Sequence, residues 1–382
     1  PSPISPRHSR IPMASSTITT MVGEIDAGEV DWGDEEAQTS KAMSGAMTGQ
    51  DNIRVAVRVR PPNNRELAGE GGGVCLDVNP EGATLAIKTM PEVSPFGFDT
   101  VFSMAVTQLQ VFETLGADLV ACSFNGYNAS MFAYGQTSSG KSFSMMGVKG
   151  TNLVGLIPRI VHLLFAVCSA SSGDRDTVIE ASYLEIYNEK VRDLLGEGKG
   201  SDNLKLREHP SLGVHVAGLT HIAVTSEFET MNAIDVGTRA RTTAATLFNT
   251  ESSRSHSVFE LHVQSKYEVE GVGMRATSRV SLIDLAGSER SSKLGSKGTA
   301  MKEGNNINKS LTVLGRCIRA LVEVAEGKKT TPPFRDSVLT YLLRDSLSGN
   351  AKTTMLAACS PATSNQQETL STLRYAASAK NI

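Results

Sequence analysis

One segment of eight residues, 135–142, has the residue types and the spacing that bind phosphate. It reads GQTSSGKS and fits the pattern G-x-x-x-x-G-K-[ST], whose glycines let backbone N–H groups wrap closely around an anion. Lys141 would bring a mobile positive charge to the terminal phosphates, and the hydroxyl of Ser142 is suited to Mg²⁺. An apolar run at 129–133 precedes the segment, as a buried strand would, and the residues after it can continue a helix whose positive end faces the phosphates. The segment predicts a site for a nucleoside phosphate, although a short pattern can match by accident in a chain with 34 glycines.

Two later segments have the residues that a sensor of the γ-phosphate needs. The first, NTESSRSH at 249–256, presents hydroxyls, an amide and a guanidinium within eight residues, although an ordinary polar turn would explain it equally well. The second, VSLIDLAGSER at 280–290, is an apolar strand run that ends in Asp284 and is followed by Gly287. A carboxylate at the tip of a core strand can hold a metal ion, and a glycine leaves its backbone N–H free for the γ-phosphate. The three segments in this order predict a P-loop enzyme.

A fourth segment could hold a purine ring. Residues 53–59 alternate apolar and charged side chains and stop at two prolines, which predicts a strand with a sharp end. Arg58, Arg60 and Pro61 could form a flat, cationic corner against such a ring. Alternatively the arginines of a half-exposed strand face water, and we interpret Arg54 in that way.

The elements that would position these segments are helices and strands, which differ in the spacing of their apolar residues. Apolar residues at helical spacing predict helices, and β-branched runs between turn residues predict strands. Beyond the strands at 53–59, 129–133 and 280–284, we expect helices at 108–124, 157–170 and 302–326, strands at 178–187 and 258–267, a short helix at 188–195, and hairpin turns at Gly213 and Gly218. This order predicts one α/β domain with a central, mostly parallel sheet and helices on both of its faces.

The first fifty residues differ in composition from the rest. They are rich in Ser, Thr, Gly and Pro, and they hold seven carboxylates against three cationic side chains, a net charge of −4 in a chain whose total is −3. We expect residues 1–50 to be a disordered acidic extension and residues 51–382 to be the folded domain. Because the chain opens with Pro and its first Met is Met13, we also expect that part of residues 1–12 is not native.

The composition also bears on other classes of protein. The five cysteines are scattered without C-x-x-C spacing and the seven histidines show no ligand spacing, which favours reduced thiols in a cytosolic protein and no structural metal. No apolar run approaches the roughly 18 residues that cross a bilayer, so we expect a soluble protein without a transmembrane segment. The folded part is nearly neutral, so an acidic partner would need a local basic patch. We expect no nucleic-acid partner.

The motifs resemble those of the kinesin motor domain family. In that family the phosphate loop reads GQTxSGKT, switch I reads NxxSSRSH and switch II reads DLAGSE; this chain has GQTSSGKS, NTESSRSH and DLAGSE. The resemblance extends over residues 53–382 and includes RVRP at 58–61, NINKSL at 306–311, FRDSVLT at 334–340 and ETLSTLRYA at 368–376. It implies the P-loop-related kinesin motor fold, which would end near residue 382 at the start of the neck linker.

The resemblance also implies a function. A kinesin motor domain is a microtubule-stimulated ATPase that couples ATP binding and hydrolysis to cyclic attachment and to force or movement along the filament. The implied cofactors are ATP or ADP with Mg²⁺, the implied partner is the microtubule of αβ-tubulin, and the implied location is the cytoplasm and its microtubule cytoskeleton. Homodimerisation would use C-terminal regions outside this chain.

Roles carry over by position. The adenine would lie between Pro61 and Phe143, and Mg²⁺ would be held by Ser142, Ser253 and Asp284, directly or through water. Gly287 would donate its N–H to the γ-phosphate, and Arg254 and Glu289 would form a charged latch between the switches while Glu289 relays a proton. Asn249, Ser252 and Ser253 would close on the γ-phosphate and the attacking water. The implied nucleotide-binding residues are Arg58, Arg60, Pro61, Gly135, Gln136, Thr137, Ser138, Ser139, Gly140, Lys141, Ser142 and Phe143.

The track-binding face is implied by cations beside switch II. The implied microtubule contacts are Arg290, Lys293, Lys297, Lys302, Asn308 and Arg335, although surface lysines are often merely solvated. Val338 and Tyr341 stand where many kinesins have Lys and Arg, which predicts a shallower salt dependence of binding. Ala377 and Ser378 stand where the family usually has Asp and Arg, which puts the usual anchoring of the last helix in question.

The motifs say less about the kinesin subclass and about alternative functions. GKS in the phosphate loop and V-L-T near an aromatic residue resemble the organelle-carrying kinesin-three class, but the loop at 326–332 has only Lys328 and Lys329 rather than a long lysine run. A GTP-dependent switch would share the phosphate loop, yet Asn308 and Lys309 are followed by Ser-Leu rather than completing N-K-x-D. A non-motile microtubule tether regulated by nucleotide would keep all the same sites.

Overall fold

The computed structural model describes residues 53–68, 73–89, 92–196, 202–210, 213–247, 252–269, 271–289, 299–349 and 351–382. For residues 89, 92, 244–247, 252 and 299–308 it describes the backbone only. The predicted disordered extension at 1–50 lies outside the described residues.

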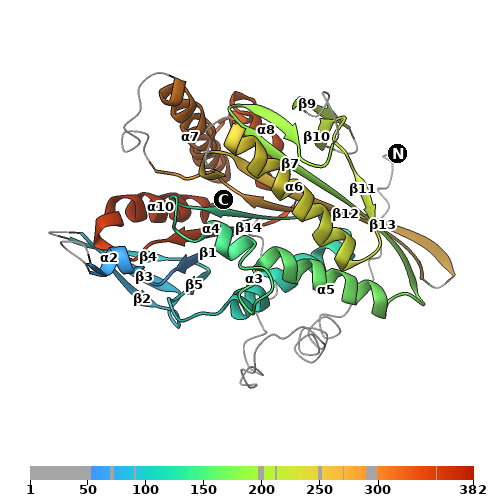
Figure 1. Cartoon of the computed structure of the whole chain (residues 1–382), viewed down its shortest axis with the longest axis horizontal. Coiled ribbons are helices and arrows are strands. Elements are labelled where there is room, and N and C mark those ends of the chain that lie inside the picture. Colours follow the sequence, from blue (N-terminus) through green and yellow to red (C-terminus); the bar gives the residue numbers. More distant parts are fainter. Residues whose placement is uncertain are drawn as a thin grey trace.

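An 11-stranded mixed sheet forms the centre of the molecule (Figure 1). Its order is β10-β9-β8-β7-β12-β13-β6-β14-β1-β5, and β11 pairs with β7. The strands are β1 (Ile53–Val59), β5 (Thr100–Phe102), β6 (Ala129–Tyr134), β7 (Arg175–Tyr187), β8 (Lys190–Asp193), β9 (Asp202–His209), β10 (Gly213–Ala217), β11 (Ile222–Val224), β12 (His256–Val269), β13 (Val272–Asp284) and β14 (Lys352–Cys359). A separate small sheet contains β2 (Leu76–Asn79), β3 (Thr84–Thr89) and β4 (Glu92–Gly97).

Parallel pairing is concentrated where the phosphate loop begins. β6 lies between β13 and β14 and is parallel to both, and β14 and β5 flank β1 in the same direction. The strands from β7 through β10, with β11, β12 and β13, pair antiparallel. The carboxyl ends of β6, β13 and β1 therefore meet at one edge, which is where an open parallel sheet places a ligand.

Helices cover both faces of the sheet, as the sequence predicts (Figure 1). The helices are α2 (Asn64–Ala68), α3 (Gln108–Phe124), α4 (Lys141–Met145), α5 (Leu156–Ala170), α6 (Glu227–Leu247), α7 (Thr299–Ala325), α8 (Val338–Leu342), α9 (Arg344–Leu347) and α10 (Gln366–Ala379), and the 3₁₀ turns are η2 (Ser252–Arg254), η4 (Phe334–Asp336) and η5 (Thr363–Asn365). Helices α3, α5 and α6 share one hydrophobic core, and α7, α8 and α10 share the other. None of the helices in the described ranges is both long and apolar enough to span a bilayer.

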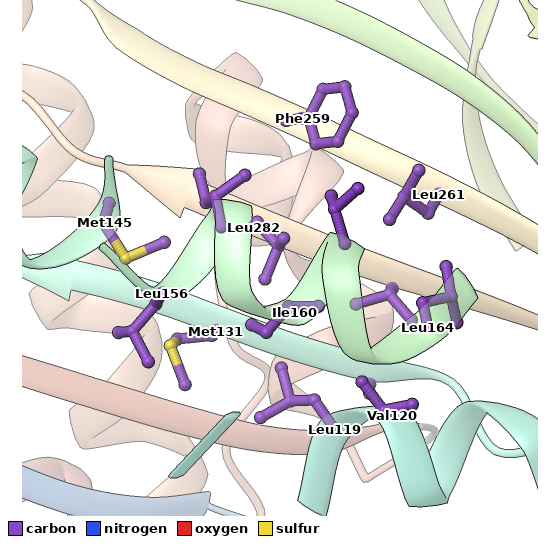
Figure 2. Close-up of a cluster of buried hydrophobic side chains, with 14 of the residues drawn as sticks. Leu119, Val120, Met131, Met145, Leu156, Ile160, Leu164, Phe259, Leu261 and Leu282 are labelled. Carbon is purple, nitrogen blue, oxygen red and sulfur yellow. The ribbon is translucent and has the colours of Figure 1, made fainter. Parts of the chain in front are cut away.

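Alternation along the strands explains the two cores. In β6, Met131 and Ala133 point into the α3–α5–α6 core, whereas Phe132 and Tyr134 point into the other, because successive side chains of a strand face opposite sides. Figure 2 shows α5 packing Ile160 and Leu164 toward the strands that carry Met131 and Leu282, with Met145 of α4 beside them. The phosphate-loop strand is thus fixed by packing on both faces.

Most of the predicted elements are present. The strand at 53–59 and the helix at 108–124 have the predicted bounds, and the helices at 157–170 and 302–326 correspond to α5 and α7 within three residues. The hairpin turn expected at Gly213 joins β9 to β10, and Gly213 has a φ of +68°. The hairpin turn expected at Gly218 is wrong, because β10 pairs with β9 and β11 pairs with β7. Despite Ala377 and Ser378, α10 buries Leu373, Ala376 and Ala379 against the sheet.

The short helix expected at 188–195 is wrong. Asn188 and Glu189 have φ of +53° and +60° and form the two-residue turn of a hairpin, after which β8 pairs antiparallel with β7. Positive φ at both central residues is the signature of a type I′ turn, and Asn favours it. The Glu189 carboxylate accepts hydrogen bonds from the Ser337 hydroxyl (2.9 Å) and the Val338 N–H (3.0 Å). The hairpin therefore caps the start of α8.

Candidate functional site

The loop at 135–140 connects β6 to α4 and depends on glycine at both ends. Gly135 and Gly140 have φ of +147° and +101°. A Cβ on Gly135 would lie 2.3 Å from the Ala358 carbonyl oxygen of the neighbouring strand β14. The loop can follow this path only because these two positions carry no side chain.

Lys141 is buried at the start of α4 and points back along the loop. Its Nζ donates to the carbonyl oxygens of Gly135 (2.8 Å) and Gln136 (2.9 Å). Burial lowers the pKa of Lys141, while the nearby Asp284 and Glu289 carboxylates act in the opposite direction. The loop thus holds an ammonium group within reach of any anion that enters it.

Ser142 of α4 meets Asp284 at the end of β13. Asp284 ends β13 opposite Ala133 of β6, and its Oδ2 accepts a short hydrogen bond from the Ser142 hydroxyl. Its other oxygen, Oδ1, is buried and has no hydrogen-bond partner. Burial raises the pKa of Asp284. A buried carboxylate oxygen without a donor, beside a hydroxyl, fits a hard divalent cation such as Mg²⁺, which takes one or two protein oxygens and completes its shell with water and phosphate.

Switch II contacts both the phosphate loop and switch I. The Gly287 N–H donates to the Ser253 carbonyl oxygen (2.8 Å), and the Ser288 N–H donates to the Gly135 carbonyl oxygen (3.1 Å). Glu289 accepts from the Thr137 N–H (2.7 Å) and from the Thr137 hydroxyl. The predicted sensor glycine and the predicted proton relay are therefore next to the loop that would bind phosphate.

Switch I is described from residue 252 onward. Ser252 to Arg254 form the turn η2, and Ser253 reaches switch II through its carbonyl oxygen. Asn249 lies outside the described residues, and of Ser252 only the backbone is described. Glu289 is bonded to Thr137, so the latch between Arg254 and Glu289 stays a prediction.

His256 connects the two switches and is the residue whose role the sequence did not suggest. It is buried; its Nδ1 accepts from the Ala286 N–H (3.0 Å), and its Nε2 lies 2.8 Å from the Ser310 hydroxyl of α7. An Nδ1 that accepts leaves the proton on Nε2, which then donates to Ser310. Burial, followed by Arg241 and Lys141, lowers the pKa of His256 to about 3. The available signal was the position of His256 at the end of the switch I motif, where β12 begins.

Arg241 fixes the base of switch I from α6. Its guanidinium donates to the Ser255 hydroxyl (3.0 Å), to the Ser255 carbonyl oxygen (3.1 Å) and to Glu185 of β7 (3.2 Å). No local pattern predicted this anchor, because Glu185 lies on β7, 56 residues before Arg241.

The predicted purine corner lines a cavity of about 170 Å³. Arg58, Arg60, Pro61 and Phe143 all contribute to its wall. The Arg58 guanidinium is buried and donates to Gln108 Oε1 (2.6 Å), and it lies 5.5 Å from the centre of the Phe143 ring. Burial lowers the pKa of Arg58 to about 10. The cavity thus has an aromatic face, a proline and a cation, as a purine site would.

Arg60 has a different role from Arg58. It forms a two-pronged pair with Glu66 (2.7 and 2.6 Å), which holds the pKa of Glu66 at about 2, and its Nε donates to the Ser138 carbonyl oxygen (2.7 Å). Arg60 therefore ties the end of β1 to the phosphate loop.

The predicted track contacts are only partly described. Arg290, Lys293 and Lys297 lie outside the described residues, and Lys302 and Asn308 lie on α7 with their side chains undescribed. Arg335 lies in η4 with 74% of its side chain exposed and donates to Glu208 (3.0 Å).

Comparison with known proteins gives consistent matches. A family model described as the kinesin motor domain matches residues 58–382. The human kinesin-like protein KIF13A is 47% identical over 351 residues, covering 86% of this chain and 19% of the relative. The kinesin-like protein unc-104 of Caenorhabditis elegans is 47% identical over 348 residues (87% and 22%), and rat KIF1A is 44% identical over 361 residues (89% and 21%). The chain spans about a fifth of the length of these relatives.

Two solved structures are similar to this fold. One is of a fast kinesin, described for its ATPase mechanism and its interactions with microtubules; it is 40% identical with a TM-score of 0.79, and the match covers 86% of this chain and 91% of that one. The other is a KIF14 dimer in a two-heads-bound state with AMP-PNP in complex with a microtubule; it is 43% identical with a TM-score of 0.79 and coverage of 86% and 94%.

Proposed function

The chain belongs to the kinesin motor domain family, and from this we propose that it is a microtubule-stimulated ATPase that turns ATP binding and hydrolysis into cyclic attachment to, and movement along, microtubules. Relatives such as KIF13A, KIF1A and unc-104 support a kinesin-three-like motor. The observation that carries the proposal is the meeting of Gly287, Ser253, Glu289 and Thr137, since it joins the phosphate loop to both switches.

Binding of the triphosphate would begin with Lys141. Its ammonium group is held by two neutral carbonyl oxygens. Hydrogen bonds to ionised acceptors are roughly twice as strong as those to neutral ones, so β- and γ-phosphate oxygens would take over these bonds. The base would enter the cavity between Pro61 and Phe143.

Ser142 and Asp284 would hold Mg²⁺, with Ser253 contributing directly or through water. The ion would neutralise charge that develops on the phosphates. Asp284 already has a buried oxygen that lacks a donor, and Ser142 already contacts its other oxygen. The pair is therefore preorganised for an oxygen-loving cation.

The sensing step would be an exchange of partners at Gly287. Its N–H now donates to the Ser253 carbonyl oxygen, and a charged γ-phosphate oxygen is a stronger acceptor. When Gly287 turns to the phosphate, Glu289 would leave Thr137. Glu289 would then be free to pair with Arg254 and to take the proton of the attacking water through a second water. Asn249, Ser252 and Ser253 would orient that water.

Coupling to the filament would follow from the link between switch II and α7. His256 bonds to Ala286 on one side and to Ser310 of α7 on the other. A shift of switch II would therefore move the helix that carries Lys302 and Asn308. With Arg290, Lys293, Lys297 and Arg335, these residues would face the acidic surface of tubulin. The protein would act at microtubules in the cytoplasm and dimerise through regions outside this chain.

The deciding experiment measures ATP turnover with and without polymerised tubulin and, in parallel, microtubule binding with AMP-PNP, with ADP and with nucleotide removed by apyrase. We expect stimulated turnover and tighter binding with AMP-PNP than with ADP, and GTP should compete poorly. Gliding by the full-length protein would then separate a motor from a static tether. Equal binding in all three nucleotide states would refute the proposal.

A further inference from the structure

Four side chains from two distant parts of the chain meet on the surface. Glu208 lies on β9, and Arg335, Tyr341 and Arg344 lie on the segment that runs from η4 to α9. Glu208 accepts from Arg335 Nη2 (3.0 Å), from the Tyr341 hydroxyl (3.2 Å) and from Arg344 Nη1 (2.7 Å). Three donors thus converge on one carboxylate, and we refer to these four residues as the Glu208 cluster.

The aromatic ring adds a platform to the cluster. The guanidinium carbons of Arg335 and Arg344 lie 5.1 and 5.9 Å from the centre of the Tyr341 ring. Arginine in this range of an aromatic ring is attracted by its negative face, so the two cations are held side by side. Donors arranged in this way form a ready-made receptor for a carboxylate.

The platform does not depend on Glu208 for its position. Asp345 accepts from the Val214 N–H (3.0 Å), which ties α9 to β10, and Glu189 caps α8 at Val338 (3.0 Å). Helix α8 lies beside the β9–β10 hairpin (Figure 1). Removal of the Glu208 charge would therefore leave the backbone of α8 and α9 in place, and the Tyr341 ring would still attract Arg335 and Arg344.

The cluster is partly open to solvent, with Arg344 only 25% exposed. The Arg335 side chain is 74% exposed and that of Glu208 is 43% exposed. The hydrogen bond from Arg344 is the largest cause that lowers the pKa of Glu208, so this carboxylate is charged at neutral pH. Exposed ion pairs are weak because water screens them, and an incoming carboxylate could displace Glu208 at little cost.

We propose that Glu208 is a built-in competitor for the acidic partner of this face: its carboxylate takes up donors of Arg335, Tyr341 and Arg344 that partner carboxylates would otherwise bind. It thereby weakens the grip of the face on that partner. The inference rests on the proposed function, in which the partner is the microtubule. The proposed contacts provide affinity for the microtubule, and Glu208 would lower that affinity.

The test is Glu208→Gln, which keeps the size of the side chain and removes its charge. Asp235→Asn is the matched control, because Asp235 lies on α6 and its change removes one charge from a surface pair with Lys149 that includes no residue of the cluster. Microtubule co-sedimentation with AMP-PNP at several salt concentrations gives the dissociation constant of each variant. We expect Glu208→Gln to bind about two- to fivefold more tightly than wild type at low salt, the range that an exposed pair can supply, and the gain should shrink as salt rises. Asp235→Asn should bind as wild type does.

A further variant assigns the gain to the cluster. In Arg335→Ala, the Glu208→Gln change should give a smaller gain than in wild type, because one of the freed donors is missing. Unchanged or weaker binding by Glu208→Gln, or an equal gain from Asp235→Asn, would overturn the inference while wild type still binds in a nucleotide-dependent way. If wild type itself fails to bind microtubules in every nucleotide state, the proposed function falls and the inference with it.

Discussion

Glu289 is held against the phosphate loop by Thr137. The Thr137 N–H donates to it at 2.7 Å and the Thr137 hydroxyl donates as well. A carboxylate that can exchange such bonds is suited to relay a proton, because its role requires it only near the reacting water and not in contact with the phosphate.

We predict that Glu289→Ala still binds ATP and microtubules but loses stimulated turnover by about a hundredfold or more, the usual effect of removing a general base. Steady-state ATPase assays with and without microtubules, together with binding of a fluorescent nucleotide, measure both properties. The exposed Glu268 at the far end of β12 provides the control Glu268→Ala, which should leave turnover unchanged. Wild-type stimulation in Glu289→Ala would rule out the relay.

His256 should make the stability of the protein depend on pH. Its pKa is lowered to about 3 in the folded protein by burial, against about 6.5 in an unfolded chain. The unfolded state therefore binds a proton that the folded state does not, so the stabilisation due to the neutral histidine is complete above pH 6.5 and is lost as pH falls toward 3. The slope can reach about 1.4 kcal/mol per pH unit.

Chemical unfolding of wild type and His256→Asn between pH 7.5 and about pH 5 measures this contribution. The free energy of unfolding should fall more steeply with acid in wild type than in His256→Asn, and the exposed His209→Asn should keep the wild-type slope. Parallel slopes in wild type and His256→Asn would show that His256 can be protonated in the folded state.

At the scale of the element, the path of switch II depends on Gly287 having no side chain. A Cβ on Gly287 would lie 2.4 Å from Glu289 Oε2 and 2.4 Å from the Thr137 hydroxyl. Such contacts cannot be accommodated without moving one of the partners. The glycine thus allows Glu289 to reach the phosphate loop.

We predict that Gly287→Ala folds and binds nucleotide but loses stimulated turnover, because the added methyl group would crowd the Thr137 hydroxyl and hinder the turn of the Gly287 N–H toward the γ-phosphate. Thermal unfolding and ATPase measurements on the same preparation test this. Gly173→Ala is a suitable control, since a Cβ there would meet nothing within 4 Å. Retained stimulation in Gly287→Ala would mean that switch II accommodates the added methyl group, and it would contradict the prediction.

Local patterns predicted elements well where one periodicity dominates. The helix α3 has its predicted bounds because apolar residues recur at helical spacing and Thr107 caps it. The segment 188–195 was misjudged because V-R-D-L-L fits a helix as well as a strand, and only pairing with β7 decides between them. Short apolar runs are ambiguous in this way.

The site was predictable to the extent that its residues belong to motifs with a recognisable spacing. Lys141, Ser142 and Asp284 come together as their motifs imply. Arg241 and His256 could not be assigned roles, because their partners Glu185, Ala286 and Ser310 come from other elements and hydrogen bonds of this kind leave no local pattern.

At the scale of the whole molecule, the two hydrophobic cores and the link from switch II to α7 determine which parts of the protein can respond to nucleotide. The sheet is packed on both faces, and within the described residues the buried His256 bonds switch II to α7. Coupling between distant sites needs such a contiguous path or an equilibrium that both ligands bias. Ser310 is where this path reaches α7.

We predict that Ser310→Ala weakens the coupling between nucleotide and microtubule by the same factor in both directions. If AMP-PNP raises the affinity for microtubules by some factor, microtubules must raise the affinity for AMP-PNP equally, because both ligands bias one equilibrium. Ser310 is buried, and its loss leaves His256 Nε2 without its acceptor, at a cost of about 1–3 kcal/mol to the arrangement that joins switch II to α7. Nucleotide titrations with and without microtubules, and co-sedimentation with and without AMP-PNP, give the two factors. Both should fall together in Ser310→Ala, whereas Ser348→Ala, on an exposed serine that follows α9, should leave both unchanged. A full coupling factor in Ser310→Ala would show that the signal reaches α7 by another route.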